Sequence, residues 1–143
     1  MVWAGGTQTI TAQNGCLKIV TTTLDAALEF GTAIDLAAQV KKFFPNGILP
    51  QGKACSMTVD QTAGTEATVA ISFQGSLDGG TTYRDVVDLT DCEATATSDA
   101  SSGCAYNNDM LYATLTHGRV YLTTRGGANV LTTTVWIRIQ QPS

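Results

Sequence analysis

The sequence predicts an all-β domain, a β-sandwich or jelly-roll-like fold with at most one short helix. Three observations lead to this prediction. Apolar and polar residues alternate with a period of two in several segments, which is typical of strands with one buried face. Threonine, a β-branched residue that favours strands over helices, occurs 23 times. Glycine-containing turn signals such as Asn14-Gly15 and Gly79-Gly80 separate the alternating segments.

The clearest alternation lies in residues 67–74, 111–116 and 131–140. Weaker strand candidates are residues 7–12, 16–23, 28–36, 54–61, 82–89 and 119–124. Further turn signals follow at Asn46-Gly47, His117-Gly118 and Gly126-Gly127. Eight or nine short strands joined by glycine turns favour a sandwich or small barrel over an α/β fold.

Residues 37–44 form the one segment with a helical pattern. Leu36, Val40 and the phenylalanines at 43 and 44 lie at helical spacing, and Thr32 with Asp35 imitates a capping box. Lys41 and Lys42 suit a helix C-terminus, and Pro45-Asn46-Gly47 would end it. Residues 30–34 fit a strand equally well, so both alternatives stay open.

The length of 143 residues predicts one domain, residues 1–143, because it can bury a core of its own. Residues 1–6 are expected to form a flexible N-terminal arm that carries Trp3. Residues 91–109 contain almost no apolar side chain beyond alanine, which predicts a long exposed loop.

Charged residues make up only 14% of the chain, and the net charge is −4. The eight lysines and arginines are scattered, so the sequence predicts no direct binding of nucleic acid. No apolar run reaches the length of a membrane span, and residues 1–6 lack the features of a signal peptide, which predicts synthesis in the cytoplasm. A neutral, threonine-rich surface suits a protein covered by neighbours, so we expect a homo-oligomer, a trimer or dimer.

No residue pattern predicts catalysis, a metal or a cofactor. His117 is the single histidine, it is expected in a hairpin turn, and no G-x-S-x-G motif accompanies it. Asp85 and the acidic residues at 88, 91 and 93 are expected to form a solvated rim; calcium is the alternative, without a D-x-D-x-D-G loop to support it. The chain is therefore predicted not to be an enzyme.

The four cysteines show no C-x-x-C pair, which argues against zinc. Cys55 belongs to an alternating apolar run and is expected in the core. Cys92 and Cys104 flank the predicted loop, where either a disulfide or two free thiols would fit the sequence.

The most specific motif is residues 76–83, S-L-D-G-G-T-T-Y, which resembles the Asp box of sialidases, S-x-D-x-G-x-T followed by an aromatic. In sialidases this box is a structural turn away from the active site. Here it predicts a rigid hairpin in which Asp78 accepts backbone hydrogen bonds and the glycines supply positive φ. The predicted turn residues are Ser76, Asp78, Gly79, Gly80, Thr82 and Tyr83.

The same hairpin, together with residues 118–123 and 134–139, resembles small β-sandwich structural proteins of tailed bacteriophages, namely capsid decoration (cement) and minor virion proteins. The resemblance covers residues 67–140. It implies a virion component, made in the host cytoplasm, that binds the major capsid protein or another virion protein and stabilises the shell through many weak contacts.

Four aromatic residues are the predicted interface: Trp3, Tyr112, Tyr121 and Trp136. By the alternation, the last three face outward on neighbouring strands, where aromatic rings serve either protein contact or sugar stacking. A shift of register by one residue would place them in the core instead. The alternative function is accordingly a carbohydrate-binding or adhesin module.

Overall fold

A computed structural model describes residues 7–23, 31–49, 55–61, 66–94, 101–106, 115–125 and 131–141. These residues form nine strands and one helix, in this order: β1 (Thr7–Gln13), β2 (Cys16–Thr23), β3 (Ile34–Asp35), α1 (Leu36–Phe43), β4 (Cys55–Gln61), β5 (Glu66–Ser76), β6 (Arg84–Ala94), β7 (Ser101–Tyr106), β8 (His117–Arg125) and β9 (Leu131–Arg138). They form two antiparallel sheets, one of order β1-β2-β9-β4-β7 and one of order β3-β8-β5-β6. The all-β prediction with one short helix is therefore confirmed.

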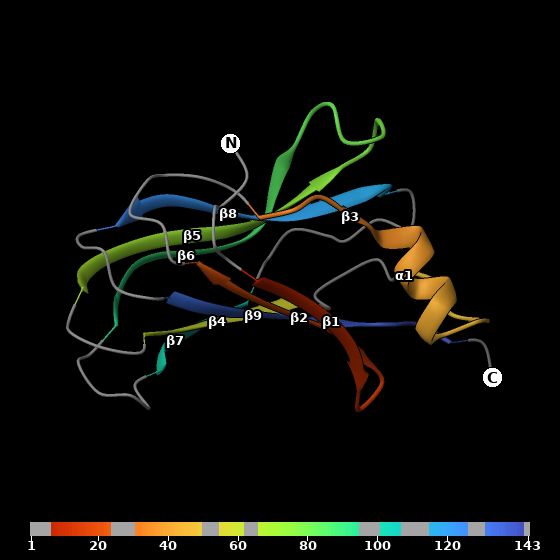
Figure 1. The fold of residues 1–143 in the computed structure, drawn as a ribbon, viewed down its shortest axis with the longest axis horizontal. Helices are drawn as coiled ribbons and strands as arrows, with labels where there is room; N and C mark the ends of the chain where they lie inside the picture. The colour runs from red at the N-terminus through yellow and green to blue at the C-terminus, as the bar shows by residue number, and fades with distance from the viewer. Residues whose placement is uncertain are drawn as a thin grey trace.

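The two sheets lie face to face as two layers, and α1 lies at one end of them (Figure 1). Each sheet contributes its apolar alternate residues to the core between the layers. The five-stranded sheet supplies Leu17, Ile19, Cys55, Met57, Val135 and Ile137, and the four-stranded sheet supplies Ile71, Phe73, Val86, Val120 and Leu122. The period-two pattern of the sequence produces this arrangement because successive side chains of a strand point to opposite faces.

The β1–β2 hairpin shows how a turn fixes the register of the strands. Asn14 and Gly15 both have positive φ, which is the conformation of a two-residue turn whose twist matches that of the strands. The turn sets Gln13 opposite Cys16 and Ile10 opposite Ile19. β2 then continues onto β9, with Leu17 opposite Ile137, so the core sides of three strands coincide.

The helix over residues 36–43 closes one end of the core. Asp35, not Thr32 as the capping-box pattern predicted, is its N-cap, because the Asp35 carboxylate accepts a hydrogen bond from the Ala38 N–H at 3.1 Å. Leu36 and Val40 are its buried residues, and Lys41 and Lys42 lie in its last turn. Within the described residues, no helix is long and apolar enough to cross a lipid bilayer.

Three predictions of local structure need correction. The expected loop at 91–109 is not one continuous loop, since its first residues belong to β6 and Ser101–Tyr106 forms β7. Of the candidate strand at 28–36, only Ile34–Asp35 is a strand among the described residues. His117-Gly118 is not a turn, because both residues pair with β3 and β5 at the start of β8. For β7 and for the start of β8, pairing with a distant strand overrides the local composition.

Some predictions fall outside the described residues. These are the arm at 1–6 with Trp3, residues 111–114 of a predicted strand with Tyr112, and the Gly126-Gly127 turn.

Gly118 packs directly against the ring of Phe73, a residue of β5 that is fully buried. A Cβ on Gly118 would lie 2.5 Å from the Phe73 Cζ, so the ring or the strand must move to make room. We therefore expect Gly118→Ala to lower the free energy of unfolding by about 1–3 kcal/mol. Urea denaturation measures it. In Phe73→Leu the same glycine change should cost less, and equal costs in both backgrounds would contradict this contact.

Candidate functional site

The turn between β5 and β6 is an ordered network around two side chains, Ser76 and Asp78. The Ser76 hydroxyl donates to Asp78 Oδ1 at 2.8 Å and accepts from the N–H groups of Asp78 and Gly80, at 3.3 and 2.9 Å. Asp78 Oδ1 also accepts from the N–H groups of Thr81 and Thr82, at 3.1 and 2.9 Å. The Asp-box pattern thus forms the hairpin that the sequence predicted.

The glycines and Thr116 complete this turn. Gly79 and Gly80 have φ of 80° and 93°, a region that side chains disfavour. The Gly79 N–H donates to Thr116 Oγ1 at 2.9 Å, and the Thr116 N–H donates to the Ser76 carbonyl at 2.8 Å. The hairpin projects from the sandwich (Figure 1) and carries Leu77, whose side chain is 61% exposed. The network therefore presents a large apolar side chain on a fixed turn.

A chain of hydrogen bonds crosses the outer face of the four-stranded sheet. The register places Gln74 of β5 opposite both Arg119 of β8 and Asp85 of β6. Arg119 Nε donates to Gln74 Oε1 at 2.9 Å, and Gln74 Nε2 donates to Asp85 Oδ1 at 2.9 Å. Ser72 Oγ donates to the same carboxylate oxygen at 3.1 Å. Ser72 and Gln74 are buried although they face away from the core, so the polar residues above them cover them.

Above this chain lies a cluster that we call the Tyr–Arg–Tyr cluster, made of Tyr83, Arg119 and Tyr121. The Arg119 guanidinium lies 3.9 Å from the centroid of the Tyr83 ring and 5.7 Å from that of the Tyr121 ring. All three side chains are half-buried. Gln74 also holds Arg119, so the position of the guanidinium is fixed. The three side chains remain partly open to solvent.

On the opposite surface, Trp136 lies on the outer face of the five-stranded sheet. It is half-buried, while its neighbours Val135 and Ile137 are buried in the core. Lys18 is opposite it on β2, and the Lys18 Nζ lies 4.9 Å from the ring centroid. Trp136 and Tyr121 thus both face outward as predicted, but on different sheets, so the structure does not bring them together.

The sequence reasoning missed Gln74 and Arg119 as site residues and treated Asp85 only as part of an acidic rim. Each occupies an outward position of a strand, and only the pairing of three strands brings them into one row. Asp85 accepts hydrogen bonds from Ser72 and Gln74, which gives its carboxylate a structural role. Among the residues that the structure describes, no group of three or more acidic, histidine or cysteine side chains could hold a metal ion.

His117 and the buried cysteines do not meet a catalytic partner among the described residues. His117 lies opposite Ser76 at the start of β8, and its buried Nδ1 has no hydrogen-bond partner there. Cys16 and Cys55 are buried free thiols. Burial raises the pKa of the Cys55 thiol to about 12, so it stays protonated and packs as a small core residue, as predicted. The side chains of Cys92 and Cys104, and hence their disulfide, lie outside the described residues.

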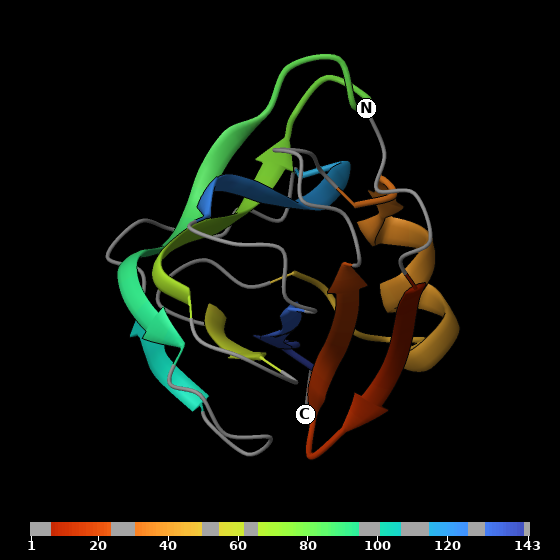
Figure 2. The same cartoon turned by 60° about the vertical axis from the view of Figure 1, so that its left-hand side comes forward.

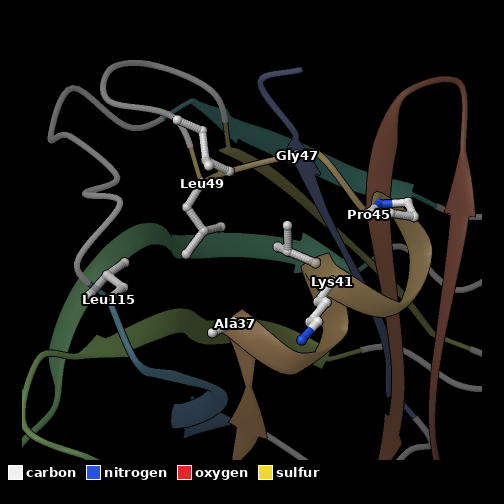
Figure 3. A pocket seen from close by; sticks show the side chains of 8 residues that line it. Ala37, Lys41, Pro45, Gly47, Leu49 and Leu115 are labelled. Atoms are coloured by element: carbon white, nitrogen blue, oxygen red, sulfur yellow. The ribbon is translucent and has the colours of Figure 1, made fainter. Parts of the chain in front are cut away.

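An open hollow of about 320 Å³ lies between α1, residues 45–49 and Leu115 (Figure 3). The described residues that line it are apolar apart from one amine: Ala37, Val40, Lys41, Pro45, Gly47, Ile48, Leu49 and Leu115. In this part of the chain the lining offers no carboxylate, imidazole, hydroxyl or thiol that would act on a bound molecule.

Replacing Ser76 by alanine should loosen the hairpin. The hydroxyl is buried and serves three hydrogen bonds, so its removal leaves the N–H groups of Asp78 and Gly80 without their acceptor. We expect a loss of about 1–3 kcal/mol in the free energy of unfolding, measured by urea denaturation. Thr9→Ala, which removes an exposed hydroxyl from β1, is the control and should change stability by less than about 0.5 kcal/mol. Equal effects of the two variants would contradict the role of Ser76.

Asp78 should make the hairpin sensitive to acid. The Thr82 N–H first, and then the Ser76 hydroxyl, lower the pKa of its carboxyl from 3.8 to about 2. Because this pKa is lower in the folded chain than in the unfolded one, the ionised carboxylate favours folding. This stabilisation is present above about pH 4 and is lost as the pH falls towards 2.

The check is the thermal midpoint of the wild type and of Asp78→Asn between about pH 5 and about pH 2. The wild type should lose more stability over this interval than the variant, which has no carboxyl group at this position. Parallel curves would show that Asp78 does not contribute.

Comparison with known proteins adds no relative: no protein-family model, no curated protein and no solved structure matches this chain.

Proposed function

We propose that this chain is a structural protein of a virion, a capsid decoration protein that binds the major capsid protein and stabilises the shell by repeated contacts. The assignment to a virion rests on the resemblance of its hairpins to those of small phage sandwich proteins. The geometry supports the more general part of the proposal, which is that the chain works by binding another protein.

The observation that carries the proposal is the Tyr–Arg–Tyr cluster on the outer face of the four-stranded sheet. Tyrosine and arginine are prominent among the residues that dominate the energy of protein interfaces. Here Arg119 is held by Gln74 at 2.9 Å and by the Tyr83 ring at 3.9 Å, so binding would cost little side-chain entropy. Leu77 is exposed on the turn between β5 and β6 and offers a further apolar contact.

The charged groups at this surface are of opposite sign, which suits contact with another protein. The Arg119 guanidinium and the Asp85 carboxylate are linked through Gln74, so the cluster and the carboxylate next to it carry both signs. Decoration requires many copies that bind weakly and together, and a half-buried surface of this kind suits such multivalent contact.

The carbohydrate-binding alternative depends on ring faces that a sugar can cover. Arg119 lies over the rings of Tyr83 and Tyr121, and Lys18 lies over the ring of Trp136, so a cation covers one face of each ring. This arrangement favours protein contact, and the alternative is kept as an outcome of the test.

Binding is tested by co-sedimentation with shells assembled from the major capsid protein of the genome that encodes the chain. Tyr83→Ala and Arg119→Lys should each weaken binding by roughly tenfold or more, because lysine lacks the planar group that stacks on tyrosine. Trp136→Ala is the matched control, an aromatic residue removed from the outer face of the other sheet, and it should bind as the wild type does.

Two outcomes would contradict the proposal. Unchanged binding of both cluster variants would show that the shell contacts another surface. The second is a wild-type chain that binds oligosaccharides but not shells. If Trp136→Ala then abolishes oligosaccharide binding, the carbohydrate module is supported instead.

A further inference from the structure

The strand β1 forms one edge of the five-stranded sheet and lacks the usual protection of an edge. Its seven residues, T-Q-T-I-T-A-Q, contain no charge and no proline. Proteins normally place lysine, proline or a bulge on such an edge to prevent pairing with another chain. β1 pairs with β2 without interruption, from Thr7–Thr22 to Gln13–Cys16. The edge is therefore regular and neutral along its whole length.

The turn determines which backbone groups of β1 point outward. In a two-residue hairpin the residues that flank the turn, here Gln13 and Cys16, exchange both of their hydrogen bonds. Odd-numbered residues of β1 therefore bond to β2. The N–H and C=O groups of Gln8, Ile10 and Ala12 point away from the sheet, and no described residue pairs with them.

These outward groups are symmetric about Ile10. We propose that a second copy of this chain pairs with β1 antiparallel around a two-fold axis at Ile10, which joins the two five-stranded sheets into one. This inference deepens the self-association within the proposed function, and it uses a different surface from the Tyr–Arg–Tyr cluster. Ile10 would lie opposite Ile10 of the second copy, and Gln8 opposite Ala12, with about six backbone hydrogen bonds across the axis.

The side chains of β1 fit this pairing. Directly opposite residues point to the same face, so the half-buried Ile10 of each copy would cover the other on the core side. Thr9 would lie opposite Thr11 on the outer face, a favourable pair of β-branched residues. No like charges meet, because β1 has none.

Helix α1 also contacts β1 (Figure 2). A second copy that pairs with β1 must therefore leave room for the helix.

Two variants test the edge while they leave the other surfaces unchanged. Ile10→Lys places like charges directly opposite across the axis. Ala12→Pro removes one outward N–H without touching the ladder to β2, since proline is accepted where the N–H faces away from the sheet. Ala38→Lys is the control, because it adds the same charge at an exposed position of α1, outside β1. Sedimentation equilibrium of the full chain at several concentrations measures the dimer, and circular dichroism checks folding.

The wild type and Ala38→Lys should form dimers, and Ile10→Lys and Ala12→Pro should raise the dissociation constant by at least about tenfold. If Ile10→Lys does not fold, Ala12→Pro decides alone. A wild type that stays monomeric, or dimers that both edge variants leave intact, would overturn the inference. Shell binding is measured separately with the monomeric variant: retained binding with a lost dimer separates the edge from the capsid contact.

Discussion

The packing of the Phe73 ring against the backbone of Gly118 is the contact on which the rest of the structure depends. At that point β5 and β8 approach so closely that a Cβ would lie 2.5 Å from the ring. This approach is part of the register that sets Gln74 opposite Arg119 and Ser72 opposite Tyr121. In the same register, His117 at the start of β8 lies opposite Ser76 at the end of β5, where the hairpin starts. The polar chain on the outer face and the position of the turn therefore share one β5–β8 register with this buried contact.

The Asp-box turn converts a loop into a rigid extension of the sheet. Its carboxylate and hydroxyl satisfy four backbone N–H groups within residues 78–82, which a turn of this length would otherwise leave to water. Thr116 ties the turn to the segment that precedes β8, so the hairpin cannot move independently of the sheet. The motif is structural here, as the resemblance to sialidases implies: it fixes the turn that carries Leu77 and Tyr83.

On each outer face of the sandwich, a cation lies over an aromatic ring. Lys18 covers the ring of Trp136, and Arg119 covers the rings of Tyr83 and Tyr121. In both places a cation covers part of an aromatic surface. The residues of β1, in contrast, carry no charge.

The sequence by itself determined the fold class, most strand positions, the Asn14-Gly15 and Asp-box turns and the burial of Cys55, because alternation and turn chemistry act over a few neighbouring residues. It also placed Trp136 and Tyr121 on outward positions. Only the tertiary structure decided that these two lie on different sheets, that Ser101–Tyr106 is a strand, and that His117 pairs within β8. The Tyr–Arg–Tyr cluster belongs to the same group: Tyr83 and Arg119 are 36 positions apart in the sequence, and the pairing of β5 with β6 and β8 brings them together. Strand order and register depend on contacts between distant segments, and no local pattern of residues encodes them.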